Sequence, residues 1–347
     1  MPIIYVASDR PGAGRTTFVA ALAQLLRQAG RDVVVAKPFA IGASSGRDND
    51  FYAKVGLAPA AADVPVPTLE RVRDAARSLQ ALAGANRTVV VEGLPLVDTA
   101  GLAVPGATQL PEALDARVVL VIQQRPGLDA VQVTATARAV GSRLAGVVLN
   151  GRTKHRGHAT SSHLVPGIEA QGARVLGVVP EDRTLLAVTV AQVAQRLEAK
   201  WLLHEEHGNK LVEHFLMGGF MLDWGRIYFG RLSHKAVICR HDRPDIQMAA
   251  LRSGTPTSAL VLTAGQETFN YDFPVQYVRH EALWLEVPVL LSRKNTVDTA
   301  TALDGITGEA RFDHPRKLER AQELLRAHVD LSSLGVPAGT LRAVQAG

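Results

Sequence analysis

The chain has 347 residues and a formal net charge of +5, with 47% hydrophobic and 20% charged residues. Because single cores stop growing beyond ~250–300 residues, we expect two domains. The mild positive charge suits anionic ligands such as phosphates, and no Lys/Arg block with interleaved aromatics marks a nucleic-acid surface. The single cysteine, Cys239, excludes an internal disulfide and a cysteine-based metal cluster. Without a membrane-length apolar run or a signal-peptide core, we expect a cytoplasmic protein with no membrane partner.

Short apolar runs alternate with amphipathic stretches over about the first 200 residues, as in βαβ units. The runs are continuous rather than alternating, which predicts strands buried on both faces of a parallel sheet. The sequence therefore predicts a doubly wound α/β domain. The predicted strands are Ile3–Ala7, Val33–Ala36, Thr88–Val91, Val118–Ile122, Gly146–Asn150 and Val175–Val179. The predicted helices are Thr16–Gln28, Leu69–Leu82 with Thr68 as N-cap, Leu128–Val140 and Leu164–Gln171.

A change in composition marks a boundary near residue 200. Arg196–Asn209 is charged and carries no strand signal, so we interpret it as a helical link. We expect domains at 1–200 and 208–330, the second a smaller α/β domain, and a flexible tail at 331–347, which is rich in small residues. The strands expected in the second domain are Ala236–Cys239, Ala259–Leu262 and Val287–Leu291, and its helices are Ile246–Arg252, Thr299–Ile306 and a closing helix Arg316–His328.

A glycine-rich loop lies between the first predicted strand and the first predicted helix, which is the context that a P-loop requires. It reads Ala7-Ser8-Asp9-Arg10-Pro11-Gly12-Ala13-Gly14-Arg15-Thr16-Thr17. Glycines let backbone N–H groups turn toward phosphate oxygens, and the helix N-terminus adds partial positive charge. Thr16 stands where a P-loop hydroxyl reaches Mg²⁺, whereas Arg15 replaces the consensus lysine. From the loop alone, an ordinary strand-to-helix turn remains an alternative. The nucleotide-binding residues expected here are Gly12, Ala13, Gly14, Arg15, Thr16 and Thr17.

Three further segments extend this pattern: Lys37-Pro38-Phe39-Ala40, Asp48 with Asp50, and Val89-Val90-Val91-Glu92-Gly93. Together with the loop, this order resembles the dethiobiotin synthetase and cobyrinic acid a,c-diamide synthase ATPases. The resemblance implies that Thr16, Asp48 and Glu92 bind Mg²⁺ with the phosphates of ATP. It also implies that Lys37 lies by the substrate and the γ-phosphate, which makes Lys37 and Arg15 the catalytic candidates. Asn150, at the end of a later strand, would read the adenine.

The second half resembles a DRTGG domain in the segments His241–Leu251 and Ala259–Gly265 and in Phe312–Lys317. DRTGG domains are regarded as ligand-sensing modules, so the resemblance implies a small-molecule effector. The candidate ligand residues are Asp242, Arg243, Asp245 and Thr263. The family's second and third motif residues, Gly-Gly, are Ala264-Gly265 here.

The whole layout resembles phosphotransacetylase-like proteins in which these two domains precede and regulate a catalytic domain. We expect no phosphotransacetylase domain here and no acetyl transfer by this chain alone. Three functions follow. The first is a regulator that binds ATP and Mg²⁺ with slow or no hydrolysis, senses an effector and is read by a protein partner. The second is an ATP-dependent ligase of the dethiobiotin or cobyrinate type. The third is a MinD-like dimerising ATPase with Arg10 reaching across a dimer. We favour the first, as a homodimer.

A cluster at His204-Glu205-Glu206-His207 invites a metal-binding interpretation. On an α-helix, however, two histidines that share a metal need i, i+4 spacing, and these have i, i+3 spacing. We therefore interpret this segment as a polar helix between the domains.

Overall fold

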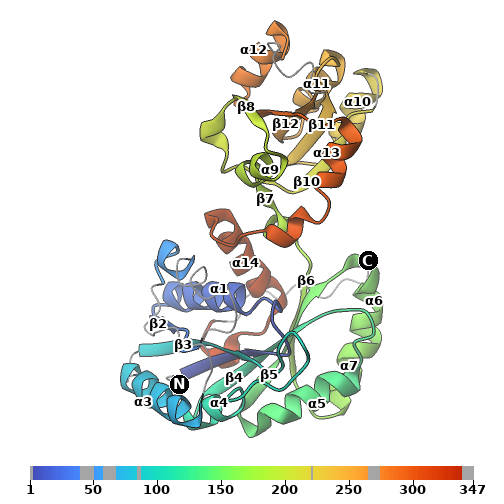
Figure 1. The fold of residues 1–347 in the computed structure, drawn as a ribbon. Helices are drawn as coiled ribbons and strands as arrows, with labels where there is room; N and C mark the ends of the chain where they lie inside the picture. The colour runs from blue at the N-terminus through green and yellow to red at the C-terminus, as the bar shows by residue number, and fades with distance from the viewer. Residues whose placement is uncertain are drawn as a thin grey trace. The chain divides into compact units, whose positions relative to one another are not determined.

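The computed structural model describes residues 3–39, 51–57, 68–83, 87–219, 222–264 and 274–337. The chain forms two compact units, one of Met1–Asp182 with Phe312–Gly347 and the other of Arg183–Arg311. Each unit has its own sheet and its own buried core (Figure 1).

The first unit is built on a six-stranded sheet in the order β2-β3-β1-β4-β5-β6. All neighbouring strands are parallel, as the continuous apolar runs predicted. The order places β1 between β3 and β4, so the chain winds outward in both directions, which confirms the doubly wound α/β class. The strands are β1 (Ile3–Ser8), β2 (Asp32–Ala36), β3 (Arg87–Pro95), β4 (Arg117–Gln123), β5 (Leu144–Arg152) and β6 (Val175–Pro180).

Helices cover both faces of this sheet. One buried cluster joins α3 (Leu69–Leu82), α4 (Gln109–Ala113), α5 (Ala130–Val140) and α7 (Val165–Ala170) to the strands, while α1 (Arg15–Gln28) lies against the other face (Figure 1). Side chains cap the starts of α3 and α5, because Thr68 accepts from the Arg71 N–H and Asp129 from the Gln132 N–H. The chain between β5 and α7, residues 154–164, is also helical.

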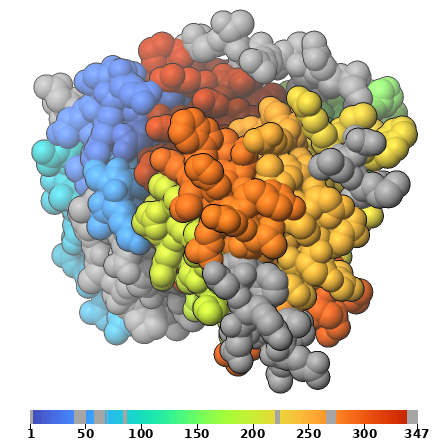
Figure 2. All heavy atoms as spheres, turned by 90° about the horizontal axis from the view of Figure 1, so that it is seen from above, coloured from blue at the N-terminus to red at the C-terminus, as the bar shows by residue number. Residues whose placement is uncertain are grey.

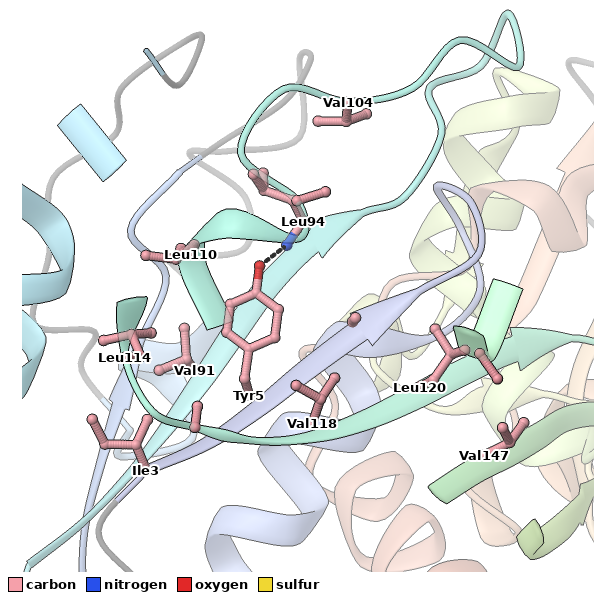
Figure 3. Packing of buried hydrophobic residues seen from close by; sticks show 14 of the residues in the cluster. Ile3, Tyr5, Val91, Leu94, Val104, Leu110, Leu114, Val118, Leu120 and Val147 are labelled. Atoms are coloured by element: carbon pink, nitrogen blue, oxygen red, sulfur yellow. Dashed lines mark hydrogen bonds between the residues drawn. The ribbon is translucent and has the colours of Figure 1, made fainter. Parts of the chain in front are cut away.

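Tyr5 fixes the end of β3 from inside the core (Figure 3). Its hydroxyl accepts a hydrogen bond of 2.9 Å from the Leu94 N–H, and burial raises the pKa of Tyr5 to about 12. A Cβ on Gly93 would lie 2.2 Å from the Tyr5 ring. Only glycine fits at that position, so the core residue Tyr5 accounts for the glycine that follows Glu92.

The second unit contains a five-stranded sheet in the order β10-β11-β12-β13-β8. Its strands are β8 (Lys200–Leu203), β10 (His214–Met217), β11 (Lys235–Arg240), β12 (Thr257–Thr263) and β13 (Val289–Ser292). Its helices are α9 (Val190–Leu197), α10 (Leu222–Phe229), α11 (Pro244–Leu251), α12 (Gln276–Trp284) and α13 (Thr296–Ala302), and β7 (Val188–Thr189) pairs with β9 (Leu211–Val212). The structure is α/β, as expected.

The helical interpretation of Arg196–Asn209 is wrong. Lys200–Leu203 forms β8, an antiparallel strand at the sheet edge beside β13. An edge strand of four residues is too short to show a period-2 pattern. Charged residues on both sides of it, including Glu205 and Glu206, further concealed the strand signal.

The closing helix α14 (Pro315–His328) belongs to the first unit rather than to the second. Gln322 accepts a hydrogen bond of 2.9 Å from Gln28 on α1, and Arg320 bonds Asp182 at 2.9 Å. After α14, Leu331, Leu334 and Val336 are buried, so residues 331–337 are packed rather than a flexible tail. Residues 338–347 lie outside the described part. The first unit therefore combines residues that precede the second unit with residues that follow it.

Candidate functional site

The loop after β1 has the backbone conformation of an anion cradle. Gly12 and Gly14 have φ values of 77° and 95°, in the left-handed region that favours glycine. Gly14 is the N-cap of α1 and offers no side-chain acceptor to the first-turn N–H groups, which belong to Arg15, Thr16 and Thr17. The start of a 14-residue helix therefore presents donors and partial positive charge at this loop.

Glu92, near the end of β3, accepts hydrogen bonds from three side chains, two of which belong to predicted site residues. Its Oε1 accepts hydrogen bonds from the Thr16 hydroxyl at 2.9 Å and from Lys37 Nζ at 3.2 Å. Its Oε2 accepts from the hydroxyl of Tyr52. Glu92 and Lys37 are only 2% and 6% exposed. The structure thus brings together Thr16, Lys37 and Glu92, three of the residues that the resemblance named; Asp48 lies outside the described residues.

Tyr52 is a site residue that the sequence did not reveal. Residues 51–54 are helical and Tyr52 is fully buried. In the sequence, Tyr52 beside the apolar Phe51 has the pattern of a core residue. No spacing rule relates it to Glu92, forty residues later. Its hydroxyl satisfies the Glu92 oxygen that Thr16 and Lys37 leave, so the buried carboxylate is fully hydrogen-bonded.

Arg15 stands at the consensus lysine position but its side chain points to the protein backbone. Its Nη1 donates a hydrogen bond of 2.7 Å to the Gly93 carbonyl oxygen. The guanidinium is therefore held against the end of β3. It links the loop to the same strand end that carries Glu92.

Asn150 contacts the loop itself. Its Nδ2 donates to the Ala13 carbonyl at 2.8 Å, and a Cβ on Gly14 would lie 2.4 Å from that nitrogen. The close approach gives a second reason for glycine at 14. Asn150 thus fixes the loop conformation from the end of β5 in this structure.

The buried Asp9 forms ion pairs with two partly exposed arginines next to the loop. Asp9 is 7% exposed and accepts from Arg125 Nη1 at 2.7 Å and from Arg10 Nε at 3.2 Å. It also accepts from the Gln123 N–H at 3.3 Å. Neither Asp9 nor Arg125 was predicted, because their partnership depends on the adjacency of β1 and β4. Arg10 is engaged within its own chain.

These residues fit a nucleoside triphosphate with Mg²⁺. The cradle and helix start match phosphate oxygens, and a hydroxyl beside a carboxylate offers the hard oxygen ligands that Mg²⁺ takes. None of the described helices has both the length and the apolar character needed to cross a bilayer.

The predicted effector residues of the second unit lie at or just after the carboxyl ends of the paired strands β11 and β12. Arg243 pairs with Asp245 at 2.9 and 2.7 Å, and Asp242 pairs with Arg240 at 2.8 Å. Hydrogen bonds from these arginines hold the pKa values of both carboxyls below their usual range. Thr263, by contrast, is buried at the end of β12, where its hydroxyl bonds Thr296 at 2.8 Å. Gly265 lies outside the described residues.

The carboxyl end of β11 carries a polar group that the sequence did not single out. Gln247 is fully buried and its Nε2 donates to the carbonyls of Arg240 and His241 at 3.0 and 3.1 Å. Within the described residues its Oε1 is buried without a hydrogen-bond partner. The neighbouring Cys239 is buried in the core, and burial raises the pKa of its thiol to about 12, which keeps it protonated.

Residues 3–189 match the family described as AAA domain, and residues 192–306 match the DRTGG domain. Phosphate acetyltransferase of Deinococcus radiodurans is 24% identical over 372 residues, which cover 96% of this chain and 51% of that protein. The Pseudomonas aeruginosa enzyme is 24% identical over 388 residues, covering 99% and 53%. The chain thus spans about half the length of these relatives. The ATP-dependent dethiobiotin synthetase BioD of Mycobacterium avium is 32% identical over 214 residues, covering 54% and 90%.

Among solved structures, the MinD cell division protein of Aquifex aeolicus aligns with a TM-score of 0.38 and 14% identity over 54% of this chain and 84% of that one. The CBS and DRTGG domains of the regulatory region of Clostridium perfringens pyrophosphatase, described in complex with the activator diadenosine tetraphosphate, align with a TM-score of 0.28 and 16% identity over 35% and 50%.

The AAA match covers more than half of the chain, and the alignment with the synthetase spans nearly all of that enzyme. The loop, the parallel sheet and the strand-end Glu92 agree with it in structure. The chain belongs to the family of dethiobiotin synthetase-like AAA P-loop domains, followed here by a DRTGG domain.

Proposed function

We propose that this chain is a regulatory protein that binds ATP and Mg²⁺, hydrolyses ATP slowly or not at all, and couples nucleotide binding to effector sensing in its DRTGG domain. The observation that carries the proposal is the contrast between two hydrogen bonds. Thr16 and Glu92 meet at 2.9 Å as a ready pair of Mg²⁺ ligands, whereas Arg15 is held by the Gly93 carbonyl at 2.7 Å.

In this proposal the first-turn N–H groups of α1 hold the phosphates, and Thr16 and Glu92 hold Mg²⁺ together with Asp48. In the structure, the Thr16 hydroxyl and Lys37 Nζ both donate hydrogen bonds to Oε1 of Glu92. Mg²⁺ would replace these two donors at that oxygen. Lys37 then faces the γ-phosphate. Asn150 keeps its hydrogen bond to the loop or reads the base.

Slow hydrolysis follows from the position and shape of Arg15. Phosphoryl transfer spreads charge over the equatorial oxygens, where a P-loop lysine supplies a compact charge. A guanidinium is planar and binds by directed two-point contacts, and this one is committed to a backbone oxygen. The ground-state triphosphate therefore gains more from the cradle than the transition state does, which is the pattern of a sensor.

For the second unit we propose a small anionic effector bound at the carboxyl ends of β11 and β12, where Arg243 and the buried Gln247 lie. The Clostridium pyrophosphatase contains a DRTGG domain and is described with diadenosine tetraphosphate as its activator, so adenine dinucleotides are the first class to test. A homodimer and a protein partner that reads its state belong to the same proposal.

A second candidate is an ATP-dependent ligase, which the 32% identity with the Mycobacterium avium synthetase favours. In that case Lys37 would act on a carboxylate or carbamate substrate. The MinD-like alternative needs Arg10 to reach a second subunit, but Arg10 pairs with Asp9 in its own chain.

The test measures binding and turnover on the same preparation. Mg-ATP binding by calorimetry, together with steady-state phosphate release, should show affinity in the micromolar range or better with turnover well below the ~1–100 s⁻¹ of kinases. Absence of binding at millimolar ATP would overturn the proposal. Turnover in the kinase range that a diamino or dicarboxylate substrate accelerates would establish the ligase instead.

A further inference from the structure

Four side chains of the kinds that bind transition metals gather at one end of β8 and β13. They are His204, Glu206, His207 and Glu286. His204 directly follows β8, and Glu286 shortly precedes β13, whose Val289 pairs with Leu203. The cluster therefore lies near the amino-terminal end of β13. Thr263 and the proposed effector site lie at the other end of the parallel strands, where β11 and β12 finish. Figure 2 shows the yellow-green segment near residue 200 at the surface beside the orange segment that includes α12.

The distances within the cluster are close to those of a metal site. His204 Nδ1 lies 2.8 Å from Glu206 Oε1, and His207 Nε2 lies 4.0 Å from that oxygen and 3.7 Å from Glu286 Oε2. The ligand atoms of His204, Glu206 and His207 all lie within 4.8 Å of one another. In a tetrahedral zinc site with bonds of about 2.0–2.1 Å, ligand atoms are about 3.4 Å apart. The ligand atoms of His204, Glu206 and His207 therefore approach this spacing, and Glu286 adjoins the group through His207.

The i, i+4 spacing rule does not apply to His204 and His207, because this segment is not an α-helix. Glu205–His207 forms a single 3₁₀ turn. In a 3₁₀ helix, side chains at i and i+3 eclipse one another, so His204 and His207 lie on one side. Their ring centroids are 5.2 Å apart.

The backbone is strained at two of the four positions. His204 and Glu286 have φ values of 58° and 51°, two of the five positive values among described non-glycine residues. Strained backbone is a cost that functional sites carry.

We propose that His204, Glu206, His207 and Glu286 form a binding site for a divalent transition-metal ion, with Zn²⁺ as the best match. Two imidazoles and two carboxylates make the mixed nitrogen and oxygen set that zinc takes in four-coordinate sites, whereas Mg²⁺ and Ca²⁺ take oxygens.

Such an ion would cross-link two segments of the second unit. Three ligands lie on the turn after β8, and the fourth lies between α12 and β13. The ion would fix the short edge strand β8 against its neighbour. A site with four protein ligands leaves no open position for substrate, so the role is structural rather than catalytic.

The test uses the full chain without a polyhistidine tag, treated with chelator and then kept in millimolar Mg²⁺. Zn²⁺ titration by competition with a chromophoric chelator should show a single tight site, and Zn²⁺ should raise the Tm. His207→Gln and Glu286→Gln should each weaken Zn²⁺ binding at least about tenfold. His280→Gln is the matched control, since His280 is an exposed histidine of the same unit on α12. Substitution with Co²⁺ should give the intense visible bands of four-coordinate cobalt.

Zn²⁺ affinity that is unchanged in both variants, or equally reduced in His280→Gln, would mean an adventitious ion only. If either variant fails to fold, the cobalt spectrum of the unaltered chain decides. Weak bands of six-coordinate cobalt would overturn the proposal.

Discussion

The Thr16 hydroxyl donates to Oε1 of Glu92 over 2.9 Å and thereby joins the first turn of α1 to the end of β3. Lys37, which follows β2, reaches the same oxygen at 3.2 Å. Residues from three separate segments therefore share one carboxylate oxygen. In the proposed complex, Mg²⁺ at this oxygen would replace these two donors and so change the contacts of both Thr16 and Lys37.

The first prediction concerns this carboxylate. Mg-ATP at about 100 times Kd should stabilise the chain by roughly 2.7 kcal/mol, which corresponds to about 5–10 °C in Tm. Thr16→Ala and Glu92→Gln should each remove most of the Mg²⁺-dependent part of that shift, because the first removes an oxygen ligand and the second removes the negative charge of the carboxylate. Thr136→Ala is the control, because it removes only an exposed hydrogen bond to the Gln132 carbonyl within α5. A full Mg²⁺-dependent shift in both variants would place the metal elsewhere.

The second prediction concerns Arg15. Arg15→Lys breaks the hydrogen bond to the Gly93 carbonyl and supplies a compact charge that can follow the γ-phosphate. We expect ATP hydrolysis to rise at least about tenfold, or 1.4 kcal/mol in barrier, with affinity for ATP little changed. Arg10→Lys in the same loop should leave hydrolysis as it is. If Arg15→Lys lowers both binding and hydrolysis, Arg15 is the phosphate ligand itself and the sensor argument fails.

The sequence predicted all six strands of the first sheet because both faces of those strands are buried, which produces continuous apolar runs. The family resemblance implied that Thr16 and Glu92 meet, and the parallel sheet explains why they do. The carboxyl ends of parallel strands share one edge, so polar residues that follow such strands come together there.

Other contacts of the site depend on side-chain directions that no pattern encodes. The direction of Arg15 toward Gly93 and the burial of Tyr52 against Glu92 are set by packing among segments distant in sequence. The same holds for α14, whose amphipathic pattern shows that it covers a sheet but not which sheet. Its place on the first unit follows from contacts such as Gln322 with Gln28.

The third prediction follows from α14. A chain that ends at Lys200 exposes the face of α1 that α14 covers and loses the buried residues Leu324 and Leu325. Burial of each such leucine contributes about 1.5–3 kcal/mol. We expect that truncated chain to aggregate or to unfold at least about 10 °C below a chain in which a short Gly-Ser linker replaces residues 183–311. Circular dichroism melting of the two compares them directly. Equal stability would show that the first unit folds without α14.

The last prediction concerns Lys235, a fully buried lysine at the start of β11. Its Nζ donates to Ser253 Oγ at 2.9 Å and to the Thr255 carbonyl at 3.0 Å, and burial lowers its pKa to about 8 from an ordinary value near 10.5. Between these pH values the unfolded chain holds a proton on Lys235 that the folded chain has lost. The unfolded state binds more protons in this window, so the contribution of Lys235 to folding stability increases as pH rises from about 8 to 10.5.

In Lys235→Met that increase is absent. Urea unfolding at steps across this window should therefore show the free energy of unfolding of the unaltered chain gaining on that of Lys235→Met as pH rises. The comparison cancels the other titrating groups, and Lys294→Met, at an exposed position of the same unit, should keep the pH profile of the unaltered chain. A constant difference between the unaltered chain and Lys235→Met across the window would mean that Lys235 stays protonated in the fold.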